Sequence, residues 1–444
     1  MTAAQVRLMI KNEGIEYFLC SFVEMSGAPK AKLVPSAAFD QMAAGGAGFA
    51  GFAAGHLGQG PHDTDIMSVP DLNSLTILPW RKNTAWLAGD LHVDGRPWPY
   101  CPRTILIRQL EKAKQQGYIL HIGVEPEFML LKENQQGRFE PWDRHDRLGK
   151  PCYDLRALHR NLDLMTTLIG YMQELGWGPY ATDHEDANCQ FEINWKYSDA
   201  LTTADRNTFF KWMVRTIAEQ HGLWATFMPK PFAHLTGNGM HYHMSLSDTA
   251  SDKNLFLDEE DKLGLSQLAR WFLGGILDHA RALAAVTSPI VNSYKRLIRS
   301  EPRSGATWAP VCVTYGSSNR TQMIRVPGPG RIENRTADGA SNPYLACAVT
   351  LAAGLDGIER KLDPGAANNE NLYALSEAEL RQRGIGFLPA TLSEAMDCLE
   401  QDEVVKAALG DAYAGYYLQV KRGEWRQYHQ SVCQWETENY LPLY

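Results

Sequence analysis

The sequence lacks several features that would place it at once in a class of protein. None of its eight cysteines forms a C-x-x-C pair, which argues against a zinc knuckle or a dithiol redox site. It contains no G-x-x-x-x-G-K-[ST] motif, so a nucleotide would not be held by a P-loop. No apolar run approaches the about 18 residues of a membrane span, and residues 1–14 have no long apolar segment. We therefore expect neither a membrane protein nor a signal peptide.

An excess of basic residues is also missing. The 444 residues include 43 Lys and Arg against 51 Asp and Glu, a formal net charge of −8. Such a chain repels a phosphate backbone, so nucleic acid is not an expected partner. Scattered cysteines in a chain of this size are typical of reduced thiols. The composition thus predicts a cytoplasmic globular protein of two or three domains.

The first hundred residues predict a small, sheet-rich domain. We expect a helix at 4–13 and strands at 18–25, 31–35, 74–80 and 84–93. The Pro- and Gly-rich segment 95–102 marks a boundary, which divides the chain into domains 1–100 and 101–444.

The second domain is predicted to mix helices with strands. Helices are expected at 103–116, 203–221, 266–286 and 342–361. Strands are expected at 118–131, 189–195, 240–246, 311–316 and 322–326. The fold class is therefore α+β.

Charged side chains at two-residue spacing stand in two of these apolar strands. Glu125 and Glu127 share one face of their strand, and so do His241 and His243 in theirs. Paired carboxylates in apolar surroundings are costly unless a cation neutralises them. The alternatives are two solvated glutamates at a strand end and a structural histidine pair.

Further carboxylates extend this set. Glu185 and Glu192 bracket the segment DANCQF, and Glu333 lies in RIENR between two arginines. A site rich in oxygen, with little nitrogen and no sulfur, favours Mg²⁺ or Mn²⁺ over zinc. Two such ions suit phosphoryl transfer, because they screen charge on both the nucleophile and the leaving group.

Seven arginines fall within forty residues of this region. A cluster interleaved with strands and a glutamate indicates a clamp for phosphate and carboxylate, because guanidinium offers forked donors. Its members are Arg296, Arg299, Arg303, Arg320, Arg325, Arg331 and Arg335.

One motif points elsewhere. Gly46-x-Gly48-x-x-Gly51 matches the dinucleotide fingerprint, but it follows the helix-like segment SAAFDQMAA and not a strand. No helix clearly follows it either, so we do not expect a Rossmann site.

Taken together, these residues resemble glutamine synthetase along nearly the whole chain. The resembling segments occur in the family's order: VEPEF, HEDANCQFE, ATFMPKP, GNGMHYHMSLS, NSYKRL, NRTQMIRVP, RIENR, ASNPYL and NLYAL. The resemblance implies an N-terminal β-grasp domain followed by a catalytic α/β domain with a curved, mostly antiparallel sheet. It also implies a homo-oligomer, usually a dodecamer of two hexameric rings with active sites shared between subunits.

The resemblance also implies a role for individual residues. ATP would be a cosubstrate, with two to three Mg²⁺ or Mn²⁺ ions at each site. One ion would be held by Glu127, Glu185 and Glu192, and another by Glu125, His241 and Glu333. Glutamate would bind to Arg296, Arg335 and the backbone at Gly237. Arg320 and Arg325 would act on the transferring phosphate, with Tyr197, His243, Ser245 and Arg331 around ATP.

Two departures from the family pattern concern the amine. The family usually has an aspartate and a serine before an S-D-x-x-x-x-P-D stretch, where counting back from Asp65 gives Gly51 and Ala54. The glutamate of its PGYEAP segment is replaced in RSEPRSGATWAP by Trp308. Both lost carboxylates belong to the family's ammonium site, and their loss leaves an apolar space.

An alkylamine would fill such a space, and the pattern resembles the glutamate–methylamine ligases. Two alternatives remain. In a divergent glutamine synthetase, Asp63, Asp65 or Glu301 could take over the role of the lost ammonium-site carboxylates. A catalytically inactive family member is disfavoured, because the implied metal ligands and arginines are all present. Tyr373 stands where some bacterial members are adenylylated, but most tyrosines in such a place are unmodified, so the sequence does not decide whether Tyr373 is.

Overall fold

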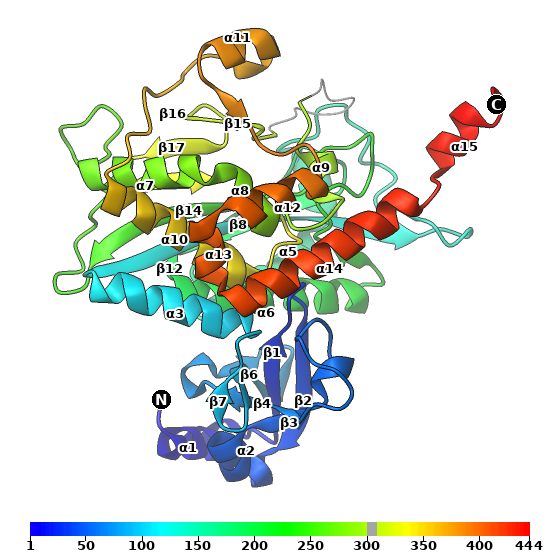
Figure 1. Cartoon of the computed structure of the whole chain (residues 1–444). Coiled ribbons are helices and arrows are strands. Elements are labelled where there is room, and N and C mark those ends of the chain that lie inside the picture. The colour runs from blue at the N-terminus through cyan, green and yellow to red at the C-terminus, as the bar shows by residue number, and fades with distance from the viewer. Residues whose placement is uncertain (300–308) are drawn as a thin grey trace.

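The computed structural model describes residues 1–299 and 309–444. Its N-terminal part, blue in Figure 1, is a seven-stranded sheet in the order β2-β1-β6-β4-β3, with β5 and β7 also paired to β6. Two helices, α1 (Ala3–Glu13) and α2 (Phe39–Gly45), accompany it. The strands are β1 (Tyr17–Val23), β2 (Pro29–Pro35), β3 (Ala47–Phe49), β4 (Ile66–Pro70), β5 (Thr76–Leu78), β6 (Arg81–Val93) and β7 (Arg96–Pro97).

The long strand β6 belongs to two hydrophobic cores. Ala85 and Leu87 point into a core built only from residues 6–101. Trp86 and Ala88 point the other way, into the main core of the molecule. Because successive side chains of a strand face opposite sides, one strand joins the small sheet to the rest of the chain.

The second sheet has ten strands and runs β10-β11-β8-β14-β18-β17-β16, with β9, β12 and β13 also paired to β8. All pairs are antiparallel except β16 with β17. The strands are β8 (Tyr118–Glu133), β9 (Phe139–Pro141), β10 (Pro179–His184), β11 (Gln190–Trp195), β12 (Ser198–Asp199), β13 (Trp224–Thr226), β14 (Met240–Asp248), β16 (Tyr315–Gly316), β17 (Ile324–Gly328) and β18 (Arg331–Asn334).

Alternate side chains of strand β8 point to opposite faces of the sheet. Leu120, Ile122 and Val124 enter the main core, while Glu125 and Glu127 face the opposite side of the sheet. Hydrophobic burial therefore fixes which face carries the carboxylates, since a shift of one residue would turn both charges into the apolar core.

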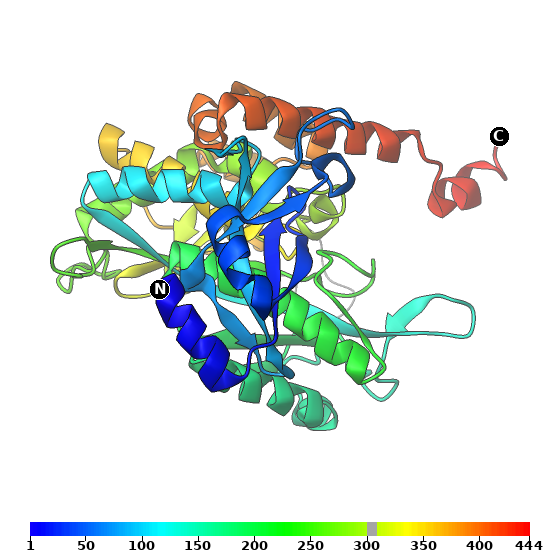
Figure 2. The ribbon, with the colours of Figure 1, turned by 90° about the horizontal axis from the view of Figure 1, so that it is seen from below.

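Helices supply the rest of the main core. The central one is α10 (Pro343–Arg360), which is buried along most of its length. The longer companions are α3 (Pro102–Gln115), α5 (Leu162–Glu174), α6 (Ala200–Gln220), α7 (Gln267–Asp278), α8 (Ala280–Thr287), α12 (Leu392–Gln401) and α14 (Asp411–Gln430). The shorter helices are α4 (Leu155–Arg160), α9 (Ser293–Arg296), α11 (Glu377–Gln382), α13 (Glu403–Leu409) and α15 (Gln434–Tyr440). Figures 1 and 2 show α14 along the outside of the molecule and α15 projecting from it. No helix in the described ranges is long and apolar enough to span a membrane.

The α+β fold class is confirmed, but three expected elements are wrong in detail. The helix expected at 266–286 is broken at His279, whose ring is held between Asp356 and Asp402. The strand expected at 311–316 is two short strands, because the Thr314 amide turns back to the Cys312 carbonyl at 2.9 Å. Its first half, β15 (Cys312–Val313), pairs with β19 (Gly386–Phe387) in a separate sheet. The strand expected at 74–80 is only β5, preceded by a 3₁₀ turn over 72–74.

Candidate active site

The register of neighbouring strands brings the predicted metal ligands together. On β14, His241 lies opposite Glu125 of β8. On β11, Glu192 lies opposite Glu127 of β8. Glu333 of β18 lies opposite His243, one position along the same face of β14 from His241. Four adjacent strands thus place charged side chains on one face of the sheet.

The first group of three comprises Glu125, His241 and Glu333, whose potential ligand atoms lie within 4.8 Å of one another. His241 Nδ1 is 3.4 Å from Glu125 Oε2 and 3.5 Å from Glu333 Oε1. Glu333 is fully buried, and Arg335 together with the two histidines holds its pKa below the usual range.

The second group comprises Glu127, Glu185 and Glu192, again within 4.8 Å. Burial, followed by the charge of neighbouring carboxylates, raises the pKa of Glu185 and Glu192 well above the usual value. Such uncompensated negative charge among oxygen ligands fits a divalent cation. The six residues therefore form the two groups that the sequence predicts.

A residue that the sequence analysis overlooked orders this second group. Gln190 donates through Nε2 to Glu127 Oε2 at 3.0 Å and to the Gly237 carbonyl at 3.0 Å. The Gly239 amide also donates to Glu127 Oε2, at 2.8 Å. The signal was present in the sequence, since Gln190 and Glu192 share one face of β11.

Two glycines allow the chain to pass close to these groups. A Cβ on Gly239 would lie 2.8 Å from His241 Nε2, 2.9 Å from Arg296 Nη2 and 3.0 Å from Glu127 Oε1. A Cβ on Gly237 would lie 2.3 Å from the Pro229 carbonyl oxygen. The turn before β14 thus leaves open a space that any side chain would fill.

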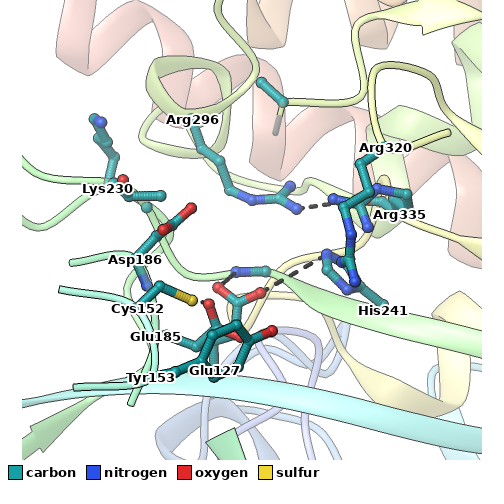
Figure 3. Close-up of a pocket in the computed structure, with 14 residues that line it drawn as sticks. Glu127, Cys152, Tyr153, Glu185, Asp186, Lys230, His241, Arg296, Arg320 and Arg335 are labelled. Carbon is teal, nitrogen blue, oxygen red and sulfur yellow. Dashed lines mark hydrogen bonds and ion pairs between the residues drawn. The ribbon is translucent and has the colours of Figure 1, made fainter. Parts of the chain in front are cut away.

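A cavity of about 330 Å³ opens over the second group of carboxylates (Figure 3). Arginines form one wall: Arg296, Arg320 and Arg335. Arg296 is fixed by donating to the carbonyl oxygens of Arg335 and Thr336, at 2.9 and 3.0 Å. Gly237 also lines this cavity, so the predicted glutamate-binding residues are together.

Arg325 lies outside the lining of this cavity and pairs with a carboxylate of the first group. Its Nη1 is 2.6 Å from Glu333 Oε2, while Arg335 Nη1 is 3.0 Å from Glu333 Oε1. Two arginines thus share one buried carboxylate, which fixes all three side chains where β17 begins and β18 ends.

A second cavity, of about 410 Å³, contains the residues predicted to surround ATP. Its lining includes Tyr197, His243, Ser245 and Arg331, together with Glu125. The exposed Tyr197 ring stands edge-on to His121, with 5.7 Å between ring centroids. His243 Nε2 is 2.8 Å from Glu125 Oε1, so the first group of ligands borders this cavity.

The described residues that were predicted to bind the amine do not line either of these cavities. Gly51 and Ala54 lie between β3 and β4, and neither lines the two cavities described. A Cβ on Gly51 would meet Ile66 at 2.6 Å, inside the N-terminal part. Trp308 and Glu301 lie outside the described residues. Tyr373 donates its hydroxyl to the Ala309 carbonyl at 2.8 Å.

The cavity lining also includes residues that were not predicted, among them Cys152, Tyr153, Asp186 and Lys230. Burial, aided by nearby Glu185, Asp186 and Asp183, raises the pKa of Cys152 to about 12, so its thiol is neutral at physiological pH. These residues come from loops and strand ends, where sequence periodicity gives no signal; the tandem Glu185-Asp186 was the one available hint.

Comparisons with known proteins bear on this arrangement. The sequence model described as "Glutamine synthetase, catalytic domain" matches residues 99–440. The chain is 46% identical over 433 residues to a glutamine synthetase of Rhizobium meliloti (strain 1021), and the matched region covers 98% of each chain. It is 44% identical over 447 residues to a glutamate–methylamine ligase of Methyloversatilis universalis, over 100% of each chain. A solved GmaS/ADP complex matches with a TM-score of 0.92 and 49% identity, over 98% of this chain and 99% of that one.

Proposed function

Since the chain belongs to the glutamine synthetase family, we propose that it is an ATP-dependent ligase that joins the γ-carboxylate of glutamate to a small alkylamine, most simply methylamine. The observation that carries the proposal is that one carboxylate group opens to a cavity walled by three arginines, while the other group borders the second cavity through Glu125. A similar chain, 44% identical, is itself a glutamate–methylamine ligase, and GmaS structures share the fold.

In this proposal the two groups hold divalent cations, Mg²⁺ or Mn²⁺. Glu127, Glu185 and Glu192 would hold one ion, and Glu125, His241 and Glu333 another. When bound, such ions screen the negative charge of ATP and of the γ-carboxylate, so that two anions can approach each other. The buried carboxylates fit this role because their own charge is otherwise uncompensated.

The protein's own side chains orient the reactants. A carboxylate is a poor electrophile, so its γ-oxygen first takes the terminal phosphoryl group of ATP, and ADP leaves. Arg296 and Arg335 would hold the carboxylates of glutamate. Arg296 is already fixed by its hydrogen bond to the Arg335 carbonyl, and Arg335 is fixed by its ion pair with Glu333. Arg320 and Arg325 would stabilise the charge on the transferring phosphate. Tyr197, His243, Ser245 and Arg331 would surround the nucleotide.

Loss of the family's ammonium-site residues favours an alkylamine acceptor. Glycine and alanine at positions 51 and 54 cannot hold a cation, and they leave apolar space. Ammonia is the second candidate, because the chain is 46% identical to the Rhizobium glutamine synthetases. In both reactions the phosphoryl transfer gives an acyl phosphate. The neutral amine then attacks its carbonyl carbon, phosphate leaves and the amide forms, so the distinction is confined to the amine.

We also propose a homo-oligomer, a dodecamer of two hexameric rings, in the cytoplasm. Gly51 and Ala54 lie between β3 and β4 and line neither cavity of their own chain. In this proposal Gly51 and Ala54 line the amine site in the cavity of a neighbouring subunit. ATP and glutamate come from the surrounding cytoplasm.

The proposal is tested by ADP release from ATP, Mg²⁺ and glutamate, with methylamine, ethylamine or ammonium as acceptor. A kcat/KM at least about tenfold higher for methylamine than for ammonium supports the alkylamine ligase. A preference for ammonium would make the protein a glutamine synthetase, and no turnover with any amine would make it an inactive member of the family.

A further inference from the structure

The wall of the 330 Å³ cavity that faces away from the arginines is built from two short loop segments. One contributes Cys152 and Tyr153, and the other contributes Glu185 and Asp186. Figure 3 shows Asp186 and Cys152 on the same side of the cavity, close to Glu185. This wall is where a cosubstrate would contact the protein if glutamate occupied the arginine side.

Asp186 differs in one respect from the other carboxylates that line this cavity. Glu127 and Glu185 belong to the second ligand group, whereas Asp186 belongs to neither group. Its residue is only 5% exposed, and its amide donates to Glu185 Oε2 at 3.1 Å. Asp186 therefore places an additional negative charge beside the proposed metal site, in surroundings with little water to screen it.

Cys152 gives the same wall an uncharged surface. Its position is fixed by the next residue, because the Tyr153 amide donates to the His184 carbonyl at 2.8 Å. Tyr153 has a φ of 64°, a left-handed backbone conformation that a tyrosine adopts only when its surroundings impose it. The loop is thus held against the end of β10, which places the Cys152 thiol beside Asp186.

A small alkylammonium ion has the complementary shape and charge: a cationic head and one short apolar group. We propose that Asp186 holds the ammonium head of the amine cosubstrate and that Cys152 contacts its alkyl group. This inference rests on the proposed function and deepens it, since it assigns the acceptor's recognition to this chain's own cavity wall. Asp186 would act by charge and Cys152 by size.

The test uses the full-length protein and separate titrations of methylamine, ethylamine, ammonium, glutamate and ATP. Asp186→Asn removes the charge at nearly constant volume, and Asp163→Asn, on the exposed side of α5, is the matched control. We expect Asp186→Asn to lower kcat/KM for every amine at least about tenfold. The KM values for glutamate and ATP should stay within about twofold, and Asp186→Glu should recover part of the loss.

Cys152 is tested by size. Cys152→Leu should lower the ratio of kcat/KM for ethylamine to that for ammonium at least about tenfold, because it fills the space for the alkyl group. Cys398→Leu, a half-buried cysteine on α12, is the control. ADP binding by each variant, measured by calorimetry, shows that the fold is intact.

The outcomes separate this inference from the proposed function. If the wild-type protein turns over no amine, the proposed function fails. If the wild type is active but Asp186→Asn leaves the amine kinetics unchanged, or shifts the KM of glutamate instead, the inference is overturned and the function stands.

Discussion

His241 lies directly opposite Glu125 across the antiparallel pair of β14 and β8, with His241 Nδ1 3.4 Å from Glu125 Oε2. The same face of the sheet carries Glu127 and Glu192, which are also directly opposite each other. The candidate site is therefore built into the hydrogen-bonded register of the sheet, and substitutions in it should affect activity more than stability.

Replacement of Glu333 by glutamine should abolish turnover. Its carboxylate belongs to the first ligand group and pairs with Arg325 and Arg335, so the change removes a ligand and leaves two guanidinium groups without their partner. We expect kcat to fall at least about 100-fold in an ADP-release assay. Glu219→Gln, exposed on α6, is the control. Near-normal activity in Glu333→Gln would remove Glu333 from the metal site.

A single methyl group at position 239 should also inactivate the protein. The Cβ of Gly239→Ala would lie within about 3 Å of His241, Arg296 and Glu127, so these side chains would have to move. We expect kcat/KM to fall at least about 100-fold while the thermal unfolding midpoint changes little. Gly415→Ala in α14 is the control, because its Cβ meets nothing within 4 Å. Unchanged activity would show that the turn can relax without loss of geometry.

Arg103 should be a main determinant of stability. Its guanidinium is 3% exposed and contacts Asp71 at 2.7 Å, Asp90 at 3.0 Å and Asp205 at 3.0 Å. Arg103→Gln leaves three carboxylates without their cation, and should lower the free energy of unfolding by about 3–5 kcal/mol. Urea denaturation measures the change.

An exposed pair provides the comparison for Arg103. Arg7 and Asp40 are 2.8 Å apart with side chains 55% and 66% exposed, so Arg7→Gln should change stability by less than about 1 kcal/mol. Equal effects of the two substitutions would contradict a special role for the buried cluster.

His279 should make stability depend on pH. Burial lowers its pKa, but hydrogen bonds to Asp402 and Asp356 outweigh burial and raise the value to about 9 from an ordinary 6.5. A pKa raised by folding contributes stability that is complete below pH 6.5 and is lost as the pH rises through 9. The contribution should be on the order of 2 kcal/mol.

Thermal unfolding of the wild type and His279→Gln at pH 6 and pH 9.5 measures this effect. The difference between the two proteins should be large at pH 6 and small at pH 9.5, whereas His221→Gln, exposed at the end of α6, should behave as the wild type does. A difference that is independent of pH would mean that His279 acts by packing and not by charge.

The sequence predicted the strand-borne part of the site well, because alternation along a strand is visible in the sequence. The spacing of Glu125 with Glu127, and of His241 with His243, was enough to place each pair on one face. Periodicity also predicted α3 and α6 to within a few residues.

The loop-borne part was not predictable in the same way. Asp186, Cys152 and Lys230 reach the cavity because distant segments meet there, and no local pattern encodes that meeting. The break at His279 had the same origin, since its ring is held by Asp356 and Asp402, which are distant in sequence. The cavity also does not include Gly51 and Ala54 of the same chain, so their assignment to the amine remains a prediction.

The shared register of β8, β14 and β18 has a consequence for how the site forms during folding. If β14 paired with β8 one residue out of step, His241 and His243 would point into the core, and Tyr242 would take their place over the carboxylates. The first proposed ion site would then lose its histidine, although its two glutamates would be unchanged. The strand pairing that closes the core therefore also completes this ion site.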